Sequence, residues 1–234
     1  MKAVAIVPAA GRGERLGPGT PKALRALAGV PMLVRAVHSV AQSPSVDLVI
    51  VVAPPESVPE VRSLLPEDQL GAVVSVVAGG ATRQESVRIG LTALPAEAEI
   101  VLVHDAARPL VPVELVDAVV AAVRDGADAV VPGLPVADTV KAVDAGELVT
   151  ETLDRATLRN VQTPQGFRRA VLEDAHAKAA DGPQDSTDDA GLVERLGLPV
   201  LVVRGHEEAF KVTRPLDLLL AEALVARHRA EAAR

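Results

Sequence analysis

The chain has 234 residues and a formal net charge of −7, with 49% hydrophobic, 24% charged and 1% aromatic residues and no cysteine. This composition is typical of a soluble globular protein and excludes disulfides and cysteine-ligated metals. The acidic charge and the scarcity of aromatic rings argue against a nucleic-acid binder. No stretch approaches the ~20 apolar residues of a membrane span, so we expect a cytoplasmic protein that does not cross a membrane.

Apolar, β-branched runs predict strands in chain order at 3–7, 48–53, 73–77, 100–103, 129–131 and 200–203. The first run ends at Pro8, which favours a first strand over a signal peptide. Near-continuous apolar strands are typical of a parallel sheet that is covered on both faces.

Amphipathic segments of helical length lie between these runs, and they predict helices at 31–41, 55–65, 83–94, 112–124, 168–180, 188–196 and 215–230. The alternation predicts a single α/β domain over 1–234, built on a doubly wound, mostly parallel, Rossmann-like sheet. In such sheets, ligands bind beyond the carboxyl ends of the strands. The loops that follow strands are therefore the candidate site.

The loop after the first predicted strand, PAAGRGERLGPGTPK at 8–22, combines four glycines with three cationic side chains. Gly11 and Gly13 would let the backbone approach a phosphate closely, and Arg15 and Lys22 would add positive charge. The glycine spacing matches neither the Rossmann fingerprint nor a P-loop. The position favours phosphate binding over a surface loop with scattered charge.

Two later loops follow strands in the same way. In GGATRQESVRIGL at 79–91, a helix is expected to begin near Thr82 or Arg83, which places Ser86 in its first turn. In VHDAARP at 103–109, Asp105 ends a central strand, and a buried carboxylate there requires a cation. That cation is either a divalent metal or Arg108, three residues further on. We interpret His104 as structural.

The segment 133–158 interrupts the alternation of strands and helices. Its runs at 139–143 and 148–152 flank Asp144-Ala145-Gly146-Glu147, a pattern that predicts a β-hairpin. The hairpin either packs on its own domain or forms an arm that reaches a second subunit. Further along, the polar stretch 180–189 contains Ser186 and Thr187, either of which would cap the next helix.

Five motifs occur in one order along the chain: PAAGRGERL…PK, GG-x-x-R-x-x-SV, VHDAARP, TPQ and KVTRP-x-D. As a set, over about residues 3 to 225, they resemble the 2-C-methyl-D-erythritol 4-phosphate cytidylyltransferase family of the non-mevalonate isoprenoid pathway. Single motifs are shared with other sugar nucleotidyltransferases, and ribitol-5-phosphate cytidylyltransferase shares most of them. A catalytically silent nucleotide-binding domain is the non-enzymatic alternative.

The resemblance implies a Mg²⁺-dependent reaction of CTP with methylerythritol phosphate, in a homodimer whose arms are exchanged. The implied catalytic cations are Arg15, Lys22, Arg155 and Lys211. The residues implied in CTP binding are Ala9, Ala10, Gly11, Gly13, Gly80 and Ser86. Those implied in substrate binding are Asp105, Arg108, Thr139, Thr163 and Thr187, and Asp105 is also the candidate Mg²⁺ ligand. Phe210 departs from the family pattern, in which a smaller aliphatic residue is expected before Lys211.

Overall fold

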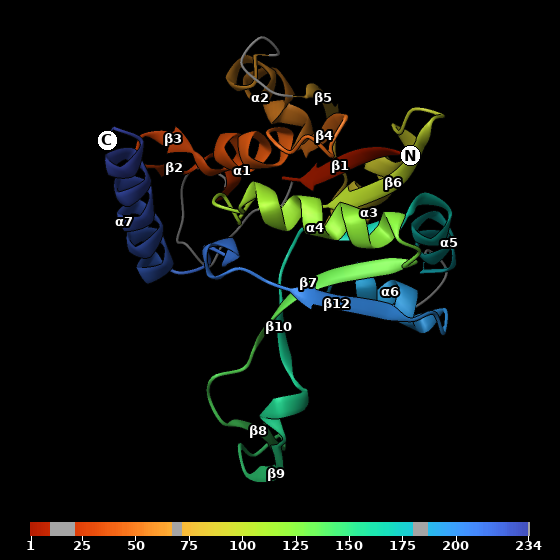
Figure 1. Cartoon of the computed structure of the whole chain (residues 1–234), viewed down its shortest axis with the longest axis vertical. Coiled ribbons are helices and arrows are strands. Elements are labelled where there is room, and N and C mark those ends of the chain that lie inside the picture. Colours follow the sequence, from red (N-terminus) through yellow and green to blue (C-terminus); the bar gives the residue numbers. More distant parts are fainter. Residues whose placement is uncertain (10–21, 67–71, 180–186, 234) are drawn as a thin grey trace.

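The structure, a computed structural model, describes residues 1–9, 22–66, 72–179 and 187–233. Its centre is an eight-stranded sheet in the order β10-β7-β11-β6-β1-β4-β5, with β12 also paired to β7 (Figure 1). The strands are β1 Lys2–Pro8, β4 Leu48–Ala53, β5 Val73–Ala78, β6 Ala98–Val103, β7 Ala129–Pro135, β10 Arg159–Val161, β11 Gln165–Arg168 and β12 Val200–Arg204. All of the strands predicted from apolar runs are confirmed.

The predicted helices are confirmed as well. They are α1 Met32–Ala41, α2 Val58–Leu64, α3 Arg83–Thr92, α4 Val113–Arg124, α5 Arg169–Ala179, α6 Ala190–Arg195 and α7 Pro215–Ala232. Short 3-10 turns occur at η2 Lys22–Leu24, η3 Pro55–Ser57, η5 Arg155–Thr157 and η6 Glu207–Ala209, and a small ribbon pairs β2 Ala26–Leu27 with β3 Val30–Pro31. In the described part of the chain, no helix combines the length and the apolar character needed to cross a bilayer.

Alternate residues of β1 enter two different apolar cores, which shows that helices cover both faces of the sheet. Ala3, Ala5 and Val7 belong to the core that is closed by α1 and α4. Val4 and Ile6 belong to the core that is closed by α3 and α5. This double coverage explains why the central strand β1 is apolar at consecutive positions from Ala3 to Val7 instead of alternating.

The sheet is mostly parallel, as predicted, but two short strands run against the others. β11 lies between β6 and β7 and is antiparallel to both, and β10 is antiparallel to β7. Gly166 allows β11 to fit there, because a Cβ at this position would lie 2.5 Å from Cγ1 of Val119 on α4. These two strands had no counterpart among the elements predicted from sequence.

The predicted hairpin is present as β8 Val140–Val143 and β9 Val149–Leu153, paired antiparallel and standing away from the sheet (Figure 1). All residues from 135 to 161 are described, and none of them is buried. The hairpin therefore does not pack on its own domain. We call residues 133–158 the arm. Its root is the β7–β10 pairing, in which Val161 faces Gly133.

Candidate functional site

The switch point of the sheet lies between β1 and β6, since β4 and β5 continue on one side of β1 and β6 begins the other. Ligands of doubly wound sheets bind at this place, beyond the strand ends. Ala9 follows β1 directly and is fixed by a hydrogen bond of 2.8 Å from its N–H to the carbonyl of Val52. Asp105 lies just after β6, so Ala9 and Asp105 lie at the ends of the two strands that flank the switch point.

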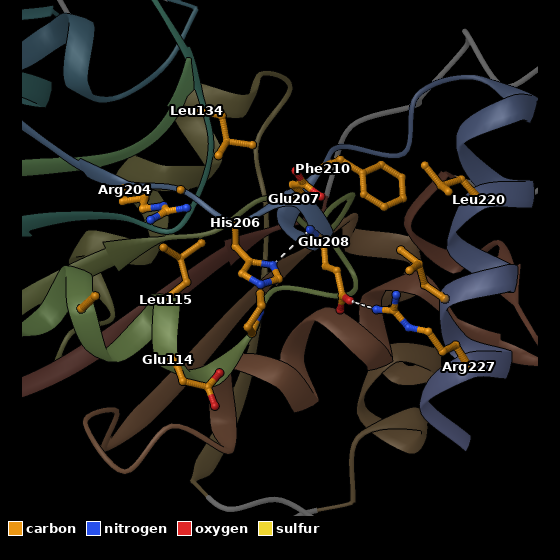
Figure 2. Close-up of a pocket in the computed structure, with 14 residues that line it drawn as sticks. Glu114, Leu115, Leu134, Arg204, His206, Glu207, Glu208, Phe210, Leu220 and Arg227 are labelled. Atoms are coloured by element: carbon orange, nitrogen blue, oxygen red, sulfur yellow. Dashed lines mark hydrogen bonds and ion pairs between the residues drawn. The ribbon is translucent and has the colours of Figure 1, made fainter. Parts of the chain in front are cut away.

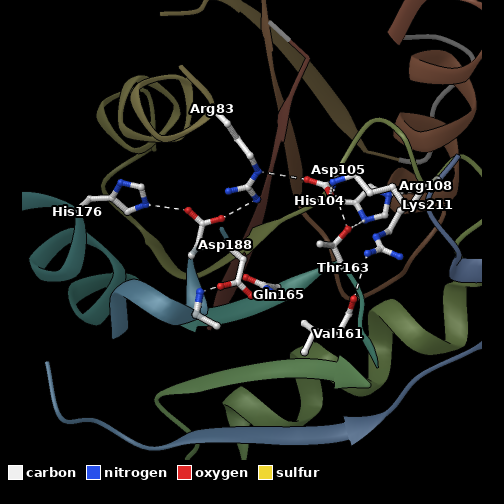
Figure 3. Close-up of polar contacts among 12 residues, drawn as sticks. Arg83, His104, Asp105, Arg108, Val161, Thr163, Gln165, His176, Asp188 and Lys211 are labelled. Atoms are coloured by element: carbon white, nitrogen blue, oxygen red, sulfur yellow. Dashed lines mark hydrogen bonds and ion pairs between the residues drawn. The ribbon is translucent and has the colours of Figure 1, made fainter. Parts of the chain in front are cut away.

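Asp105 is held by two cations, which come from different parts of the chain (Figure 3). Its Oδ1 lies 3.3 Å from Nε of Arg83, and its Oδ2 accepts a hydrogen bond of 2.7 Å from Nζ of Lys211. Burial acts to raise the pKa of Asp105, but Arg83 and Lys211 outweigh it and hold this pKa well below its usual value. The two cations in contact with Asp105 are therefore Arg83 and Lys211, whereas Arg108, one of the two alternatives open from the sequence, lowers this pKa only as a further charge nearby.

Arg108 instead ties two segments together through their backbones. Its buried guanidinium donates a 2.6 Å hydrogen bond to the carbonyl of Ala209 and a 3.2 Å hydrogen bond to the carbonyl of Val161. Burial lowers the pKa of Arg108, and the nearby Asp105 opposes that shift. In this arrangement Arg108 anchors the arm root and the segment before Lys211.

Thr163 and His104 complete a hydrogen-bonded chain beneath Asp105. The Asp105 N–H donates to Oγ1 of Thr163 at 3.0 Å, and this oxygen lies 3.1 Å from Nδ1 of His104. Because Nε2 of His104 faces the Arg108 carbonyl at 3.1 Å, Nε2 must carry the proton and Nδ1 must accept from Thr163. Burial lowers the pKa of His104 to about 4. A neutral imidazole in this position is structural, as interpreted from the sequence.

The ion pairs extend inward from Arg83. Its NH2 lies 2.8 Å from Oδ2 of Asp189, which is 1% exposed, and Oδ1 of Asp189 lies 3.0 Å from Nε2 of His176. None of these three residues was singled out from the sequence as a site residue. The position of Arg83 in the GG-x-x-R motif was a usable signal, but nothing in the sequence linked it to Asp189.

The loop between β5 and α3 has the expected geometry. Thr82 caps α3, since its Oγ1 accepts a 3.0 Å hydrogen bond from the N–H of Glu85. The buried Ser86 hydroxyl accepts from the Gly80 N–H at 3.3 Å and donates to the Thr82 carbonyl at 2.9 Å. A Cβ on Gly80 would lie 2.3 Å from the Glu85 side chain, so a larger residue there would have to displace that side chain. Cytidine binding by Gly80 and Ser86 stays a prediction.

The arm residues are not brought to Asp105 within one chain. Thr139 and Arg155 are exposed and adjoin β8 and β9, and Arg155 donates to the carbonyl of Ala137 within the arm.

Thr187 is also exposed, and the expectation that it caps α6 was wrong. Asp189 occupies the N-cap position of α6, and Oδ1 of Asp188 accepts the Gly191 N–H at 3.0 Å. Thr187 has a shorter side chain than Asp188 and precedes it by one residue, so its hydroxyl does not cap the Gly191 N–H. Ser186, the other predicted cap, lies outside the described residues.

Several predicted site residues also lie outside the described part of the chain. They are Ala10, Gly11, Gly13, Arg15 and the side chain of Lys22.

The described ranges contain no group of three or more His, Asp, Glu or Cys side chains that would hold a metal ion. Both oxygens of Asp105, the candidate ligand, are paired with cations. Mg²⁺ in nucleotide enzymes keeps several waters and takes one or two carboxylates together with substrate phosphates. The described residues therefore fit a metal held chiefly by substrate phosphates, with Asp105 as the single protein ligand among them.

A cavity of about 580 Å³ lies beside the Lys211 segment, between α4, η6 and α7 (Figure 2). Glu208 on η6 pairs with Arg227 on α7 at its wall. Phe210 lines this cavity and packs against the apolar cluster that contains Met32. The bulky ring is therefore accommodated without preventing Lys211 from reaching Asp105.

Comparison with known proteins gives one consistent result. The chain matches the family described as 2-C-methyl-D-erythritol 4-phosphate cytidylyltransferase over residues 3–227. It is 62% identical to the protein of that name from Streptomyces coelicolor, with 97% of this chain and 86% of the relative covered. It is 56% identical to the one from Rhodococcus opacus, with 95% and 94% covered.

Solved structures agree with the sequence relatives. The crystal structure of 4-diphosphocytidyl-2C-methyl-D-erythritol synthase from Anaerococcus prevotii is similar with a TM-score of 0.85 at 28% identity, and 96% of each chain is covered. The crystal structure of 2-C-methyl-D-erythritol 4-phosphate cytidylyltransferase from Thermus thermophilus has a TM-score of 0.77 at 41% identity, with 96% of this chain and 98% of that chain covered.

Proposed function

Because this chain belongs to the 2-C-methyl-D-erythritol 4-phosphate cytidylyltransferase family, we propose that it transfers CMP from CTP to 2-C-methyl-D-erythritol 4-phosphate. The products are CDP-methylerythritol and pyrophosphate, and the reaction serves isoprenoid precursor biosynthesis. The observation that carries the proposal is the pairing of Asp105 with Lys211 and Arg83 at the switch point, within a chain that matches the family almost end to end.

In this reaction a phosphate oxygen of the acceptor attacks the α-phosphorus of CTP, and the bond from that phosphorus to the bridging oxygen of pyrophosphate breaks. The attacking phosphate is already ionised near pH 7, so no general base is required. This agrees with His104, whose buried and neutral ring is committed to Thr163 and the Arg108 carbonyl. Positioning and charge neutralisation therefore provide the catalysis.

Lys211 is the described cation best placed to meet the acceptor phosphate. Its side chain is 38% exposed, and Asp105 fixes the ammonium at the strand ends. Thr163 supports Asp105 from below through the backbone N–H. Arg15 and Lys22 are proposed to stabilise the charge that develops on the triphosphate, by virtue of their place in the glycine-rich loop after β1.

A divalent ion such as Mg²⁺, when bound, would neutralise the charge of the triphosphate. Asp105 is the described carboxylate that would contact it, through Oδ1 in exchange for its longer contact of 3.3 Å with Arg83, while Oδ2 keeps Lys211.

The arm is proposed to cross a two-fold homodimer, so that Thr139 and Arg155 serve the site of the other subunit. Two observations support this. No residue from 135 to 161 is buried within its own chain, and the arm exposes the apolar side chains of Val143, Leu148 and Val149. Exposed apolar side chains on a protruding element favour burial against a partner.

The function is tested by pyrophosphate release from CTP, UTP, ATP and GTP, each with methylerythritol phosphate and with ribitol 5-phosphate as acceptors. We expect the highest kcat/KM with CTP and methylerythritol phosphate. A higher value with ribitol 5-phosphate would reassign the substrate, and nucleotide binding without turnover of any acceptor would indicate a silent nucleotide-binding domain.

A further inference from the structure

Asp189 and His176 are too deeply buried to touch a substrate, but the guanidinium of Arg83 connects them to the proposed acceptor site. Asp189 is 1% exposed and His176 is 2% exposed. A line of contacts runs from His176 through Asp189 and Arg83 to Asp105, and Figure 3 labels His176, Arg83 and Asp105 along it. It ends at the ammonium of Lys211, so charges of opposite sign alternate from Asp189 to Lys211.

Stability alone does not account for the inner pair. Placing a carboxylate and a guanidinium out of water is costly, and apolar residues of similar volume often replace buried ion pairs with no loss of stability.

The contact distances show that Arg83 is held more closely by Asp189 than by Asp105. Arg83 lies 2.8 Å from Asp189 but 3.3 Å from Asp105, whereas Lys211 lies 2.7 Å from Asp105.

We propose that Asp189 and His176 are positioning residues that hold Arg83, and thereby leave Asp105 free to fix Lys211 for the acceptor phosphate. His176 donates from Nε2 to Oδ1 of Asp189 and so orients that carboxylate. The other oxygen then faces Arg83. Without the charge of Asp189, Arg83 has Asp105 as its one carboxylate partner. Arg83 then moves closer to Asp105 and competes with Lys211 for that carboxylate. The kinetic part of this inference rests on the proposed function.

The main variant is Asp189→Asn, which keeps the side-chain volume and removes the charge. We expect the KM for methylerythritol phosphate to rise roughly tenfold, the scale of one charge-assisted hydrogen bond, while the KM for CTP stays within about twofold. A merely structural role would instead lower the fraction of active enzyme, which reduces kcat and leaves both KM values unchanged. Unchanged or equally raised KM values would overturn the proposal.

His176 provides a conservative pair of variants. His176→Gln keeps an N–H donor for Asp189, so we expect an acceptor KM near that of the wild type. His176→Leu fills the space without a donor and should raise the acceptor KM several-fold. If the Leu variant behaves like the Gln variant, packing alone matters and the proposal fails. Asp117→Asn is the matched control, because Oδ1 of Asp117 accepts a 2.6 Å hydrogen bond from Ser43 between α1 and α4, away from this line of contacts.

A second readout needs no turnover and therefore separates this inference from the proposed function. Lysine acylation is followed by mass spectrometry in the folded wild type and in each variant, with Lys178 as internal reference because it pairs with Asp174 on the exposed side of α5. Asp189→Asn and His176→Leu should speed the acylation of Lys211 several-fold relative to Lys178. An unchanged ratio in both folded variants would show that Lys211 does not depend on the buried pair. If Asp189→Asn fails to fold, His176→Leu alone decides.

Discussion

The ammonium of Lys211 lies 2.7 Å from Oδ2 of Asp105, although 106 positions separate the two residues in the sequence. This contact joins the turn after β6 to the segment that leads into α7. Arg83 neutralises the other oxygen of Asp105 from the start of α3. A single carboxylate at a strand end thus gathers cations from two distant elements, and this arrangement defines the described part of the site.

Lys211→Ala is expected to lower kcat/KM for methylerythritol phosphate by roughly 10²-fold, because the site loses a preorganised cation. The free energy of unfolding should also fall, by about 1–3 kcal/mol, because the buried carboxylate of Asp105 then keeps only Arg83 as an ion-pair partner. Steady-state kinetics and urea unfolding measure the two effects. Lys178→Ala is the control, as it removes an exposed cation of α5. A large loss of stability with little kinetic change would contradict this role.

Arg15→Ala and Lys22→Ala should each lower kcat by roughly 10²-fold, the scale of losing one preorganised donor at the charge that develops in the transition state. Single-turnover and steady-state measurements with CTP separate binding from chemistry. If kcat stays near the wild-type value and only the KM for CTP rises, the loop binds CTP equally in the ground and transition states.

His104 should make the stability of the fold depend on pH. Burial lowers its pKa from 6.5 to about 4, so between these values the unfolded chain binds a proton that the folded protein does not bind. The stabilisation is complete above about pH 6.5 and is lost as the pH falls toward about 4.

Lowering the pH from 7 to 5 should therefore remove about 2 kcal/mol of unfolding free energy through His104 alone. His104→Gln should unfold more easily at pH 7 but lose less stability on acidification. Urea unfolding of both proteins at the two pH values measures the difference. Parallel losses in the wild type and the variant would exclude His104 as the source.

The crossed arm predicts rescue in mixed dimers. Lys22→Ala and Arg155→Ala homodimers are each expected to be nearly inactive. If Arg155 serves the site of its partner, a mixed dimer has one site with both changes and one intact site. Random mixing of equal amounts makes half of the dimers mixed, so roughly a quarter of the wild-type activity should return.

Subunit exchange in that experiment is first verified by native mass spectrometry of tagged chains. With exchange established, activity no higher than that of the parent homodimers would place Arg155 in the site of its own chain.

The main strands and helices were predictable because each signal is local. A strand buried on both faces must be apolar throughout, and β1 shows this at consecutive positions that enter opposite cores. β11 escaped prediction because its four residues, Gln165–Arg168, carry no apolar run. Its position between β6 and β7 depends on the return of the chain from the arm and on the absence of a side chain at Gly166.

The sequence predicted which residue types form the site, but not which side chains form ion pairs with one another. The burial of Asp105 at the end of β6 predicted a cation beside it. The sequence did not show which cation this is, because Arg108 is as plausible a partner as Arg83 or Lys211. The choice is made by tertiary packing, since Arg108 is drawn to the carbonyls of Ala209 and Val161. Asp189 and His176 gave no local signal at all, because their significance comes only from the contact with Arg83.

The two hydrogen bonds of Arg108 have a mechanical consequence. One buried guanidinium spans the last residue of β10, where the arm rejoins the sheet, and a carbonyl two residues before Lys211. If the segment before Lys211 shifts alone, the guanidinium loses its 2.6 Å hydrogen bond to the buried carbonyl of Ala209, at a cost of about 1–3 kcal/mol. The base of the arm and the segment that carries Lys211 are thus joined through one side chain, so a displacement of either is expected to act on the other through Arg108.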